Sequence, residues 1–405
     1  MKFHFNLADI KKAQKNIAGI VKKTDLVYDC EASRKLGGRL YLKMENDQVV
    51  HSFKIRGALN ALKNLTPQQA KAGVVAASAG NHAQGVAYSA TKLGIKSIIV
   101  MPNSAPAAKV KATLRFGAEV VFGPTPFFDD ANKLSQQLAK KNGYTLIPPY
   151  DDANVMAGQG TIGVELLQQN PDLDMVIVQI GGGGLISGVA TAIKTIKPSC
   201  EVIGVQTENF PYAFDAYSGH TLKSPTRNVP TIADGIQVKQ PSATAIKIMK
   251  KYVSRVVTVK EQEIRRAIAW LAEKDKTVAE GAGATGIAAV LSRMIDIRGR
   301  NVAVIISGGN IDIDKFIAVC IESLNETRQR VAFKLFYEPK TYKLIFTILQ
   351  AVSGRIYCLN GTKVLTIDDK LCKGWNELSL FTTSCKNTNR FFTALKLHKV
   401  KFKLF

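Results

Sequence analysis

Short apolar runs alternate with amphipathic segments along most of this chain. The runs are about four to six residues long and rich in Val and Ile, which is typical of buried strands. Between them, apolar residues recur every three or four positions, as they do on one face of a helix. Strands that alternate with helices predict an α/β fold with parallel sheets. The predicted strands lie at 39–43, 73–78, 97–101, 118–122, 144–147, 175–180, 202–206, 255–259 and 302–307.

The predicted helices fill most gaps between these strands. One long gap, residues 209–230, contains Pro, Gly and Ser without a regular apolar period, and we expect a loop there. The first part of the chain therefore contains two strand–helix series, one before and one after residue 150. The predicted helices lie at 7–21, 53–62, from 81 onward, and at 109–116, 129–142, 163–169, 185–196, 243–252, 261–274, 284–294 and 313–324.

The pattern changes after residue 330. The order of elements becomes β-α-β-β-α-β, which is that of a ferredoxin-like α+β unit. Thirteen lysines and arginines face four acids between residues 331 and 405, so the charge changes as well. We place a domain boundary near residues 328–330. Here the predicted strands are 331–337, 355–359, 378–381 and 400–404, and the predicted helices are 341–351 and 388–397.

Composition indicates a folded chain with a strong positive charge. The 405 residues allow two or three domains, and 46% hydrophobic with 21% charged residues is typical of globular proteins. The formal net charge is +23. Binding to nucleic acid is one explanation, but the lysines are spread along the chain without a dense block or interleaved aromatic residues. We therefore expect no nucleic-acid partner, and a general positive potential that attracts anionic ligands.

The cysteines and the apolar runs bear on metal binding and location. The six cysteines form no Cys-x-x-Cys pair, which argues against a zinc site and against a disulfide framework. We expect reduced thiols and no bound metal. No apolar run is long enough to span a bilayer, and residues 1–9 lack the apolar core of a signal peptide. We expect a cytoplasmic protein without a membrane partner.

Lys54 is the most informative candidate residue. It lies between Phe53 and Ile55, at the start of a predicted helix. Desolvation in a partly apolar setting lowers the pKa of an amine and makes it reactive toward an aldehyde. Most lysines are solvated surface charges, so the motif alone is only a hint. It gains weight from three segments that each follow a predicted strand, where ligands gather in open α/β sheets.

The first of these segments is Gly181-Gly182-Gly183-Gly184-Leu185, between a buried strand and a helix. Four glycines allow close backbone approach, so that several N–H groups at the helix start can converge on a phosphate. The alternative is a flexible turn. However, four successive glycines lose much conformational entropy on folding, so we expect them only where a ligand or a close backbone approach requires them. We therefore favour a phosphate site.

The other two segments are less specific. Ser78-Ala79-Gly80-Asn81 can bind a carboxylate through backbone N–H groups, although Asn81 can also be only a helix cap. Ser307, before Gly308 and Gly309, can present a neutral hydroxyl to a ligand, although an ordinary turn explains that motif alone. Nothing near His82 pairs it with a nucleophile, so we expect a structural role for it.

Taken together, these motifs resemble the fold-type II pyridoxal-phosphate enzymes, and among them the threonine dehydratases (threonine ammonia-lyases). The resemblance extends from about residue 7 to about residue 320. It includes the four segments above and several shorter strings in the same order. Those strings are Tyr41 to Asn46, Ser52 to Ala58, Pro148 to Asp152, Ala157 to Thr161, Thr231 to Gly235 and Glu280 to Gly283.

The resemblance implies a role for each candidate residue. Lys54 holds pyridoxal 5′-phosphate through an imine and later takes the Cα proton of the substrate. Phe53 packs on one face of the pyridine ring, Asn81 bonds its phenolic oxygen, and Ser307 meets its nitrogen. The substrate carboxylate lies in the segment Ser78, Ala79, Gly80 and Asn81. The cofactor phosphate is held by Gly181, Gly182, Gly183, Gly184 and Leu185.

The resemblance also implies domains and a reaction. Residues 1–50 with 151–327 form a large cofactor-binding domain, 51–150 a small catalytic domain, and 331–405 a regulatory or assembly unit similar to ACT domains. We expect β-elimination of L-threonine to 2-oxobutanoate and ammonia, with L-serine as a second substrate. We also expect a homo-oligomer, dimer or tetramer, and leave open an amino-acid or nucleotide effector.

Two alternatives remain open. One is serine racemisation with serine dehydration on the same scaffold, but Gln206 stands where serine racemases carry a glutamate metal ligand. The other is a catalytically inactive protein whose basic tail binds nucleic acid, against which the intact Lys54, glycine loop and Ser307 argue. In the tail, Lys340 stands where the effector loop of ACT domains has glycine. We therefore expect assembly rather than effector binding to be its main role.

Overall fold

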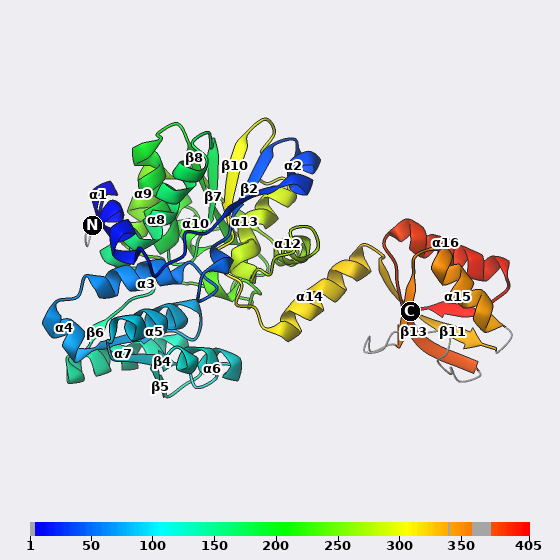
Figure 1. The fold of residues 1–405 in the computed structure, drawn as a ribbon, viewed down its shortest axis with the longest axis horizontal. Coiled ribbons are helices and arrows are strands. Elements are labelled where there is room, and N and C mark those ends of the chain that lie inside the picture. The colour runs from blue at the N-terminus through cyan, green and yellow to red at the C-terminus, as the bar shows by residue number, and fades with distance from the viewer. Residues whose placement is uncertain (1–4, 339–340, 359–373) are drawn as a thin grey trace. The chain divides into compact units, whose positions relative to one another are not determined.

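The computed structural model describes residues 5–338, 341–358 and 374–405 (Figure 1). The chain divides into two compact units, Met1–Asp312 and Ile313–Phe405, and each is described by itself. The sequence pattern placed a boundary near residues 328–330, whereas the contacts assign helix α14 (Ile313–Glu326) to the second unit.

The first unit contains a six-stranded sheet in the order β1-β2-β10-β7-β8-β9. Only β1 runs antiparallel to its neighbour in this sheet. Helices cover both faces: Val176 and Val178 join the apolar cluster of helix α9, whereas Ile177 faces Gly286 of helix α13. The strands are β1 (Leu26–Asp29), β2 (Arg39–Lys43), β7 (Met175–Gln179), β8 (Glu201–Thr207), β9 (Arg255–Val259) and β10 (Asn301–Ile305).

A second, four-stranded sheet in the same unit has the order β5-β4-β3-β6, and all its pairs are parallel. Its two faces are covered by helix α5 and by helix α7. Val74 and Ala76 pack with α5, and Val75 packs with α7, as the alternation along a strand requires. The strands are β3 (Val74–Ala77), β4 (Ser97–Met101), β5 (Glu119–Phe122) and β6 (Thr145–Leu146).

Helices α3 and α8 join the parts of the unit that carry these two sheets. They approach at backbone distance, because a Cβ on Gly158 would lie 2.5 Å from the carbonyl oxygen of Arg56. The helices of the first unit are α1 (Leu7–Ile17), α2 (Cys30–Leu36), α3 (Lys54–Lys63), α4 (Pro67–Ala72), α5 (Asn81–Leu93), α6 (Ala107–Arg115), α7 (Phe128–Asn142), α8 (Ala153–Gln169), α9 (Gly184–Ile196), α10 (Tyr212–Ser218), α11 (Ala243–Tyr252), α12 (Glu261–Glu273) and α13 (Gly281–Leu291), with 3-10 turns η1 (Glu45–Asp47) and η2 (Asp234–Ile236).

The second unit follows the predicted β-α-β-β-α-β order after α14. Its sheet has the order β12-β13-β11-β14 with every pair antiparallel, and α15 and α16 pack on one face around Phe333 and Phe391. Lys340, in the predicted effector loop, lies outside the described residues. The elements are β11 (Arg330–Tyr337), α15 (Tyr342–Ala351), β12 (Arg355–Cys358), β13 (Gly374–Phe381), α16 (Cys385–Leu397) and β14 (Phe402–Leu404).

The largest departures from the predicted elements concern helices of the first unit. Helix α8 begins at Ala153 rather than at residue 163, since Gly158 and Gly160 weaken the helical signal although their helix is buried. The predicted loop at 209–230 contains α10. Among the described cysteine side chains, those of Cys30, Cys200, Cys320 and Cys385 are free thiols.

No helix in the described part of the chain is both long and apolar enough to cross a membrane.

Candidate active site

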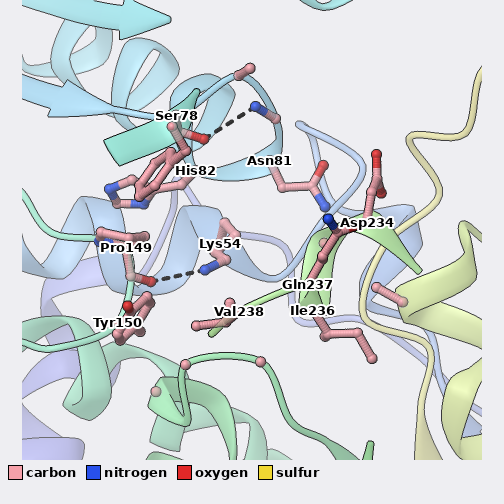
Figure 2. A pocket seen from close by; sticks show the side chains of 18 of the residues that line it. Lys54, Ser78, Asn81, His82, Pro149, Tyr150, Asp234, Ile236, Gln237 and Val238 are labelled. Atoms are coloured by element: carbon pink, nitrogen blue, oxygen red, sulfur yellow. Dashed lines mark hydrogen bonds between the residues drawn. The ribbon is translucent and has the colours of Figure 1, made fainter. Parts of the chain in front are cut away.

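One cavity of about 630 Å³ in the first unit contains all the candidate residues that the sequence indicated (Figure 2). It opens beyond the carboxyl ends of β3, β7 and β10, so the segments that follow these strands meet there. The predicted residues that line it are Phe53, Lys54, Ser78, Ala79, Gly80, Asn81, Gly181, Gly182, Gly183, Gly184, Leu185 and Ser307.

Lys54 is the first residue of α3 and points into this cavity. Its Nζ donates a hydrogen bond to the carbonyl oxygen of Pro149 at 2.8 Å (Figure 2). Burial lowers the pKa of this amine to about 8, against the opposing charge of Glu280. The Phe53 ring centroid lies 5.3 Å from the same nitrogen. About a tenth of the amine is therefore neutral and nucleophilic at pH 7, far more than for an ordinary lysine.

The glycine loop connects β7 to the N-terminus of α9. Gly183 caps this helix with φ of +95°, a conformation that strongly favours glycine. A Cβ on Gly182 would lie 2.3 Å from the ring of Tyr150, so the loop and this ring pack without room for a side chain. The free N–H groups at the start of α9 suit a phosphate.

Asn81 begins α5 and is held by two residues from distant parts of the chain. Its Nδ2 donates to Glu280 Oε1 at 2.6 Å, and its Oδ1 accepts from Asn310 Nδ2 at 2.7 Å. These two bonds fix which way the amide points. An amide nitrogen carries two hydrogens, so Asn81 keeps a second N–H for a ligand.

The loop after β3 and the residue after β10 are also tied to the site. Ser78 Oγ accepts a hydrogen bond from Gly80 N at 3.1 Å (Figure 2). The backbone oxygen of Ser307 accepts from Phe53 N at 3.0 Å, which joins the end of β10 to the start of α3. His82 Nε2 is 2.9 Å from the carbonyl oxygen of Ile147, and burial, aided by Lys54, lowers its pKa to about 3. His82 therefore stays neutral.

Sequence reasoning gave no role to Glu280, Asn310 or Lys109. Glu280 belongs to a quoted motif and Asn310 directly follows the Ser307 motif, but their contact with Asn81 appears only in the fold. Lys109 Nζ of α6 pairs with Asp234 Oδ2 of η2 at 2.8 Å and joins the parts of the chain that carry the two sheets. In the sequence, the signal for Glu280 is an acid directly before the glycine-rich segment Gly281 to Gly283.

The cavity thus combines a reactive amine, an anion-binding helix start and oriented amide groups. A family model described as pyridoxal-phosphate dependent enzyme matches residues 17–308. An L-threonine ammonia-lyase from Thermotoga maritima is 46% identical over 352 residues, which cover 86% of this chain and 87% of that protein.

Solved structures of related enzymes are also similar to this chain. The processed form of threonine deaminase isoform 2 from Solanum lycopersicum is 36% identical with a TM-score of 0.72, covering 77% of this chain and 91% of that chain. Maize serine racemase is 31% identical with a TM-score of 0.73, covering 80% of this chain and 100% of that chain.

The fold and the residues of the cavity together are those of an α/β enzyme that binds a cofactor. The chain belongs to the family of pyridoxal-phosphate-dependent enzymes, which confirms the predicted fold class and cofactor. Its residues fit the cofactor: Lys54 supplies the amine, the amides before α9 suit the phosphate, and the Asn81 N–H suits an oxygen acceptor.

Glu280 leads to a pH prediction. Burial, and then Asp234, raise the pKa of its carboxyl from 4.5 to about 7, although Asn81, Lys109 and Lys54 oppose the shift. Between these two values the folded protein retains a proton that the unfolded chain has lost. The free energy of unfolding of the cofactor-free protein should therefore fall as pH rises through this window, by about 3 kcal/mol at most from this group.

The variant Glu280→Gln should lose this part of the pH dependence in urea unfolding measured at both ends of the window. Glu119→Gln, at a half-exposed position, is the matched control and should behave like the parent. An unchanged pH dependence in Glu280→Gln would show that this carboxyl is not held protonated by the fold.

Proposed function

We propose that this protein is an L-threonine ammonia-lyase that forms 2-oxobutanoate and ammonia, and that it also accepts L-serine. The Thermotoga maritima relative supports this activity by its name, at 46% identity. The single observation that carries the proposal is the buried Lys54 amine, whose pKa is lowered to about 8, in one cavity with the glycine loop. Both are needed to hold the cofactor and to move a proton.

Bound pyridoxal phosphate supplies an electron sink that acidifies the α-proton of an amino acid. Lys54 would attach the cofactor through its amine and would be the base that takes that proton from the substrate. The backbone amides of the loop Ser78 to Asn81 bind the substrate carboxylate. The amides from Gly181 to Leu185 bind the phosphate.

Two further side chains set the charge in the cavity. Ser307 offers a hydroxyl, which is neutral, so it presents no negative charge to the ring nitrogen. Glu280, with a pKa of about 7, holds a proton in part of the molecules at neutral pH and fixes the Asn81 amide. The neutral Ser307 hydroxyl and the partly protonated Glu280 suit a β-elimination, because the pyridine ring of the cofactor would not need to hold a full negative charge in that reaction.

Serine racemisation is the second candidate, and the likeness to maize serine racemase favours it. Gln206 argues against a metal-dependent form of it. Its Oε1 accepts hydrogen bonds from the backbone of Ala213 and Phe214 at 3.0 and 2.9 Å, so this oxygen already serves to hold the start of α10.

The test of the proposal is the release of 2-oxo acid from L-threonine and L-serine, measured beside the formation of D-serine, with and without Mg²⁺. We expect 2-oxobutanoate from threonine as the faster product. Formation of D-serine faster than any 2-oxo acid would favour the racemase. No product from either amino acid would overturn the proposed function.

We further propose that the protein is a homo-oligomer and that the second unit contributes to assembly more than to effector response. The first unit contains every cofactor-binding candidate. A chain ending at Asp312 should therefore keep the cofactor and basal turnover while its mass in light scattering decreases. Titration of both chains with isoleucine and with AMP measures any effector response. Loss of the cofactor from the shortened chain, or an unchanged oligomeric state, would contradict this prediction.

A further inference from the structure

The sheet of the second unit has one face covered by helices and one face that carries aromatic and basic side chains. Along β11, Phe333 and Leu335 lie in the helix-covered core, so Lys334 and Phe336 point to the other side. Along β13, Leu378 and Leu380 are buried in the same core. Trp375 and Phe381 alternate with them and lie on the face opposite the helices.

We call this surface the aromatic–basic face and define it by Phe336, Tyr357, Trp375, Phe381, Lys401 and Lys403. The rings form two pairs across neighbouring strands: Phe336 with Trp375 at 5.4 Å, and Tyr357 with Phe381 at 4.6 Å between centroids. Trp375 is 45% exposed although it is a large aromatic residue. The other three rings are partly buried, so Trp375 offers the main surface for stacking, and a large exposed aromatic residue among basic side chains is typical of an interaction surface.

Cations lie over the same rings. Lys403 Nζ is 5.2 Å from the Trp375 ring centroid, Lys401 Nζ is 5.6 Å from that of Phe336, and the Arg330 guanidinium is 5.7 Å from that of Phe381. These interactions are worth little at exposed positions. A planar group that stacks on a ring can therefore displace the cation, which then remains close enough to pair with an anion attached to that group.

We propose that the aromatic–basic face binds single-stranded nucleic acid. Every nucleobase has a flat face that can stack on an exposed aromatic ring, so this binding does not depend on the nucleotide sequence. A lysine or arginine beside the ring neutralises the phosphate of the same nucleotide. A four-stranded βαββαβ sheet with aromatic residues on its central strands is also the scaffold with which RNA-recognition motifs stack two or three bases. Here the central strands β11 and β13 carry Phe336, Trp375 and Phe381.

Charge argues for a polyanion rather than a second copy of this chain. Arg330, Lys334, Lys401 and Lys403 all lie at this face, and the acidic Glu377 there is already paired with Lys334 at 2.6 Å. Two copies docked face to face would bring these like charges together, which is unfavourable. From residue 331 onward the sequence has thirteen basic residues against four acids.

A nucleic-acid partner differs from what the sequence alone led us to expect. The lysines are spread along the whole chain without a dense basic block, so we expected no nucleic-acid partner. The basic and aromatic residues of this face come from four strands, and only the sheet pairing of β14, β11, β13 and β12 brings them together. The proposal is independent of the proposed activity, because it concerns the second unit alone.

The experiment measures fluorescence anisotropy of a short fluorescein-labelled oligouridylate with the full-length holoenzyme over a range of KCl concentrations. We expect Trp375→Ala to weaken binding about 5- to 100-fold with little change in salt dependence, since it removes one stacking ring. The double variant Lys401→Ala/Lys403→Ala should instead lower the slope of log affinity against log salt by about 1.4, because each lost phosphate contact counts for about 0.7.

Matched controls lie elsewhere on the protein. Phe122→Ala removes another exposed ring, at a 52% exposed position of β5, and Lys343→Ala removes an exposed lysine of α15. Both should bind like the parent, and melting temperature checks that every variant is folded. Absence of binding, equal affinity for Trp375→Ala and Phe122→Ala, or dissociation of a protein dimer in Trp375→Ala would overturn the proposal, the last in favour of a second copy.

Discussion

Replacing Lys54 by alanine is expected to abolish both turnover of threonine and the absorbance band of the imine between Lys54 and the cofactor. Lys54 is the amine that reaches the cavity from the start of α3, and its lowered pKa of about 8 makes it a nucleophile and a base near neutral pH. A positioned proton-transfer group contributes about 10²- to 10⁴-fold, and Lys54 also attaches the cofactor, so we expect a fall in rate of at least about 10³-fold.

Lys63→Ala is the matched control, because Lys63 ends the same helix and is exposed. It should keep both the absorbance and the activity. Addition of a small primary amine to Lys54→Ala should restore part of the turnover if the missing group is the base. The free energy of unfolding of the cofactor-free variant should not fall, since the substitution removes an amine that burial disfavours as a cation. Retention of the imine band in Lys54→Ala would show that Lys54 is not the residue that attaches the cofactor.

Elements with strong local signals were predicted closely from the sequence. The limits of β4 (Ser97–Met101) and β9 (Arg255–Val259) coincide with the predicted ones. Strand β4 is fully buried and most residues of β9 are buried as well, so both strands have short runs of Val or Ile with polar or turn residues beside them. By contrast, α8 is buried on nearly all sides and rich in glycine, and its first ten residues lack the amphipathic period that would reveal a helix.

The same distinction applies to the candidate site. The glycine loop has a recognisable local pattern between a strand and a helix, whereas Lys54 and Ser307 became candidates because their motifs occur together with it. Glu280 and Asn310 did not become candidates, because they act through Asn81, which lies 199 and 229 residues away in the chain. These contacts are set by the fold, so a single sequence cannot reveal that Glu280 and Asn310 meet Asn81. The roles of these residues in catalysis stay predictions, and Lys54→Ala tests the role of Lys54.

Arg56 should be the residue whose loss most reduces stability. It lies two residues after Lys54, with a fully buried side chain bonded to two carboxylates. Its guanidinium meets Glu45 at 2.8 Å and Glu165 at 2.7 Å, and Lys43 Nζ lies 2.7 Å from the other oxygen of Glu165. Breaking such a buried network by removal of one partner costs about 3–5 kcal/mol, because the remaining charges lose their compensation.

The variant Arg56→Met keeps much of the apolar volume and removes the charge, so urea unfolding of the cofactor-free protein measures that loss. Arg34→Met is the matched control, since Arg34 pairs with Glu31 at the same 2.8 Å on the surface and should contribute less than about 1 kcal/mol. Arg56→Lys should not restore stability, because an ammonium cannot bond both carboxylates as a guanidinium does. The proposal fails if Arg56→Met and Arg34→Met have similar effects.

The pH dependence gives an independent check on the same residue. Burial raises the pKa of Glu45, but Arg56, together with Lys43 and Thr24, outweighs burial, so the pKa of this carboxyl lies below its usual value in the folded protein. Its contribution to stability is therefore present above the unfolded pKa of about 4.5 and is lost as pH falls through the folded value. Without Arg56, burial dominates and the folded pKa rises. Mild acidification should then reduce the stability difference between Arg56→Met and the parent, whereas the Arg34→Met difference should not change.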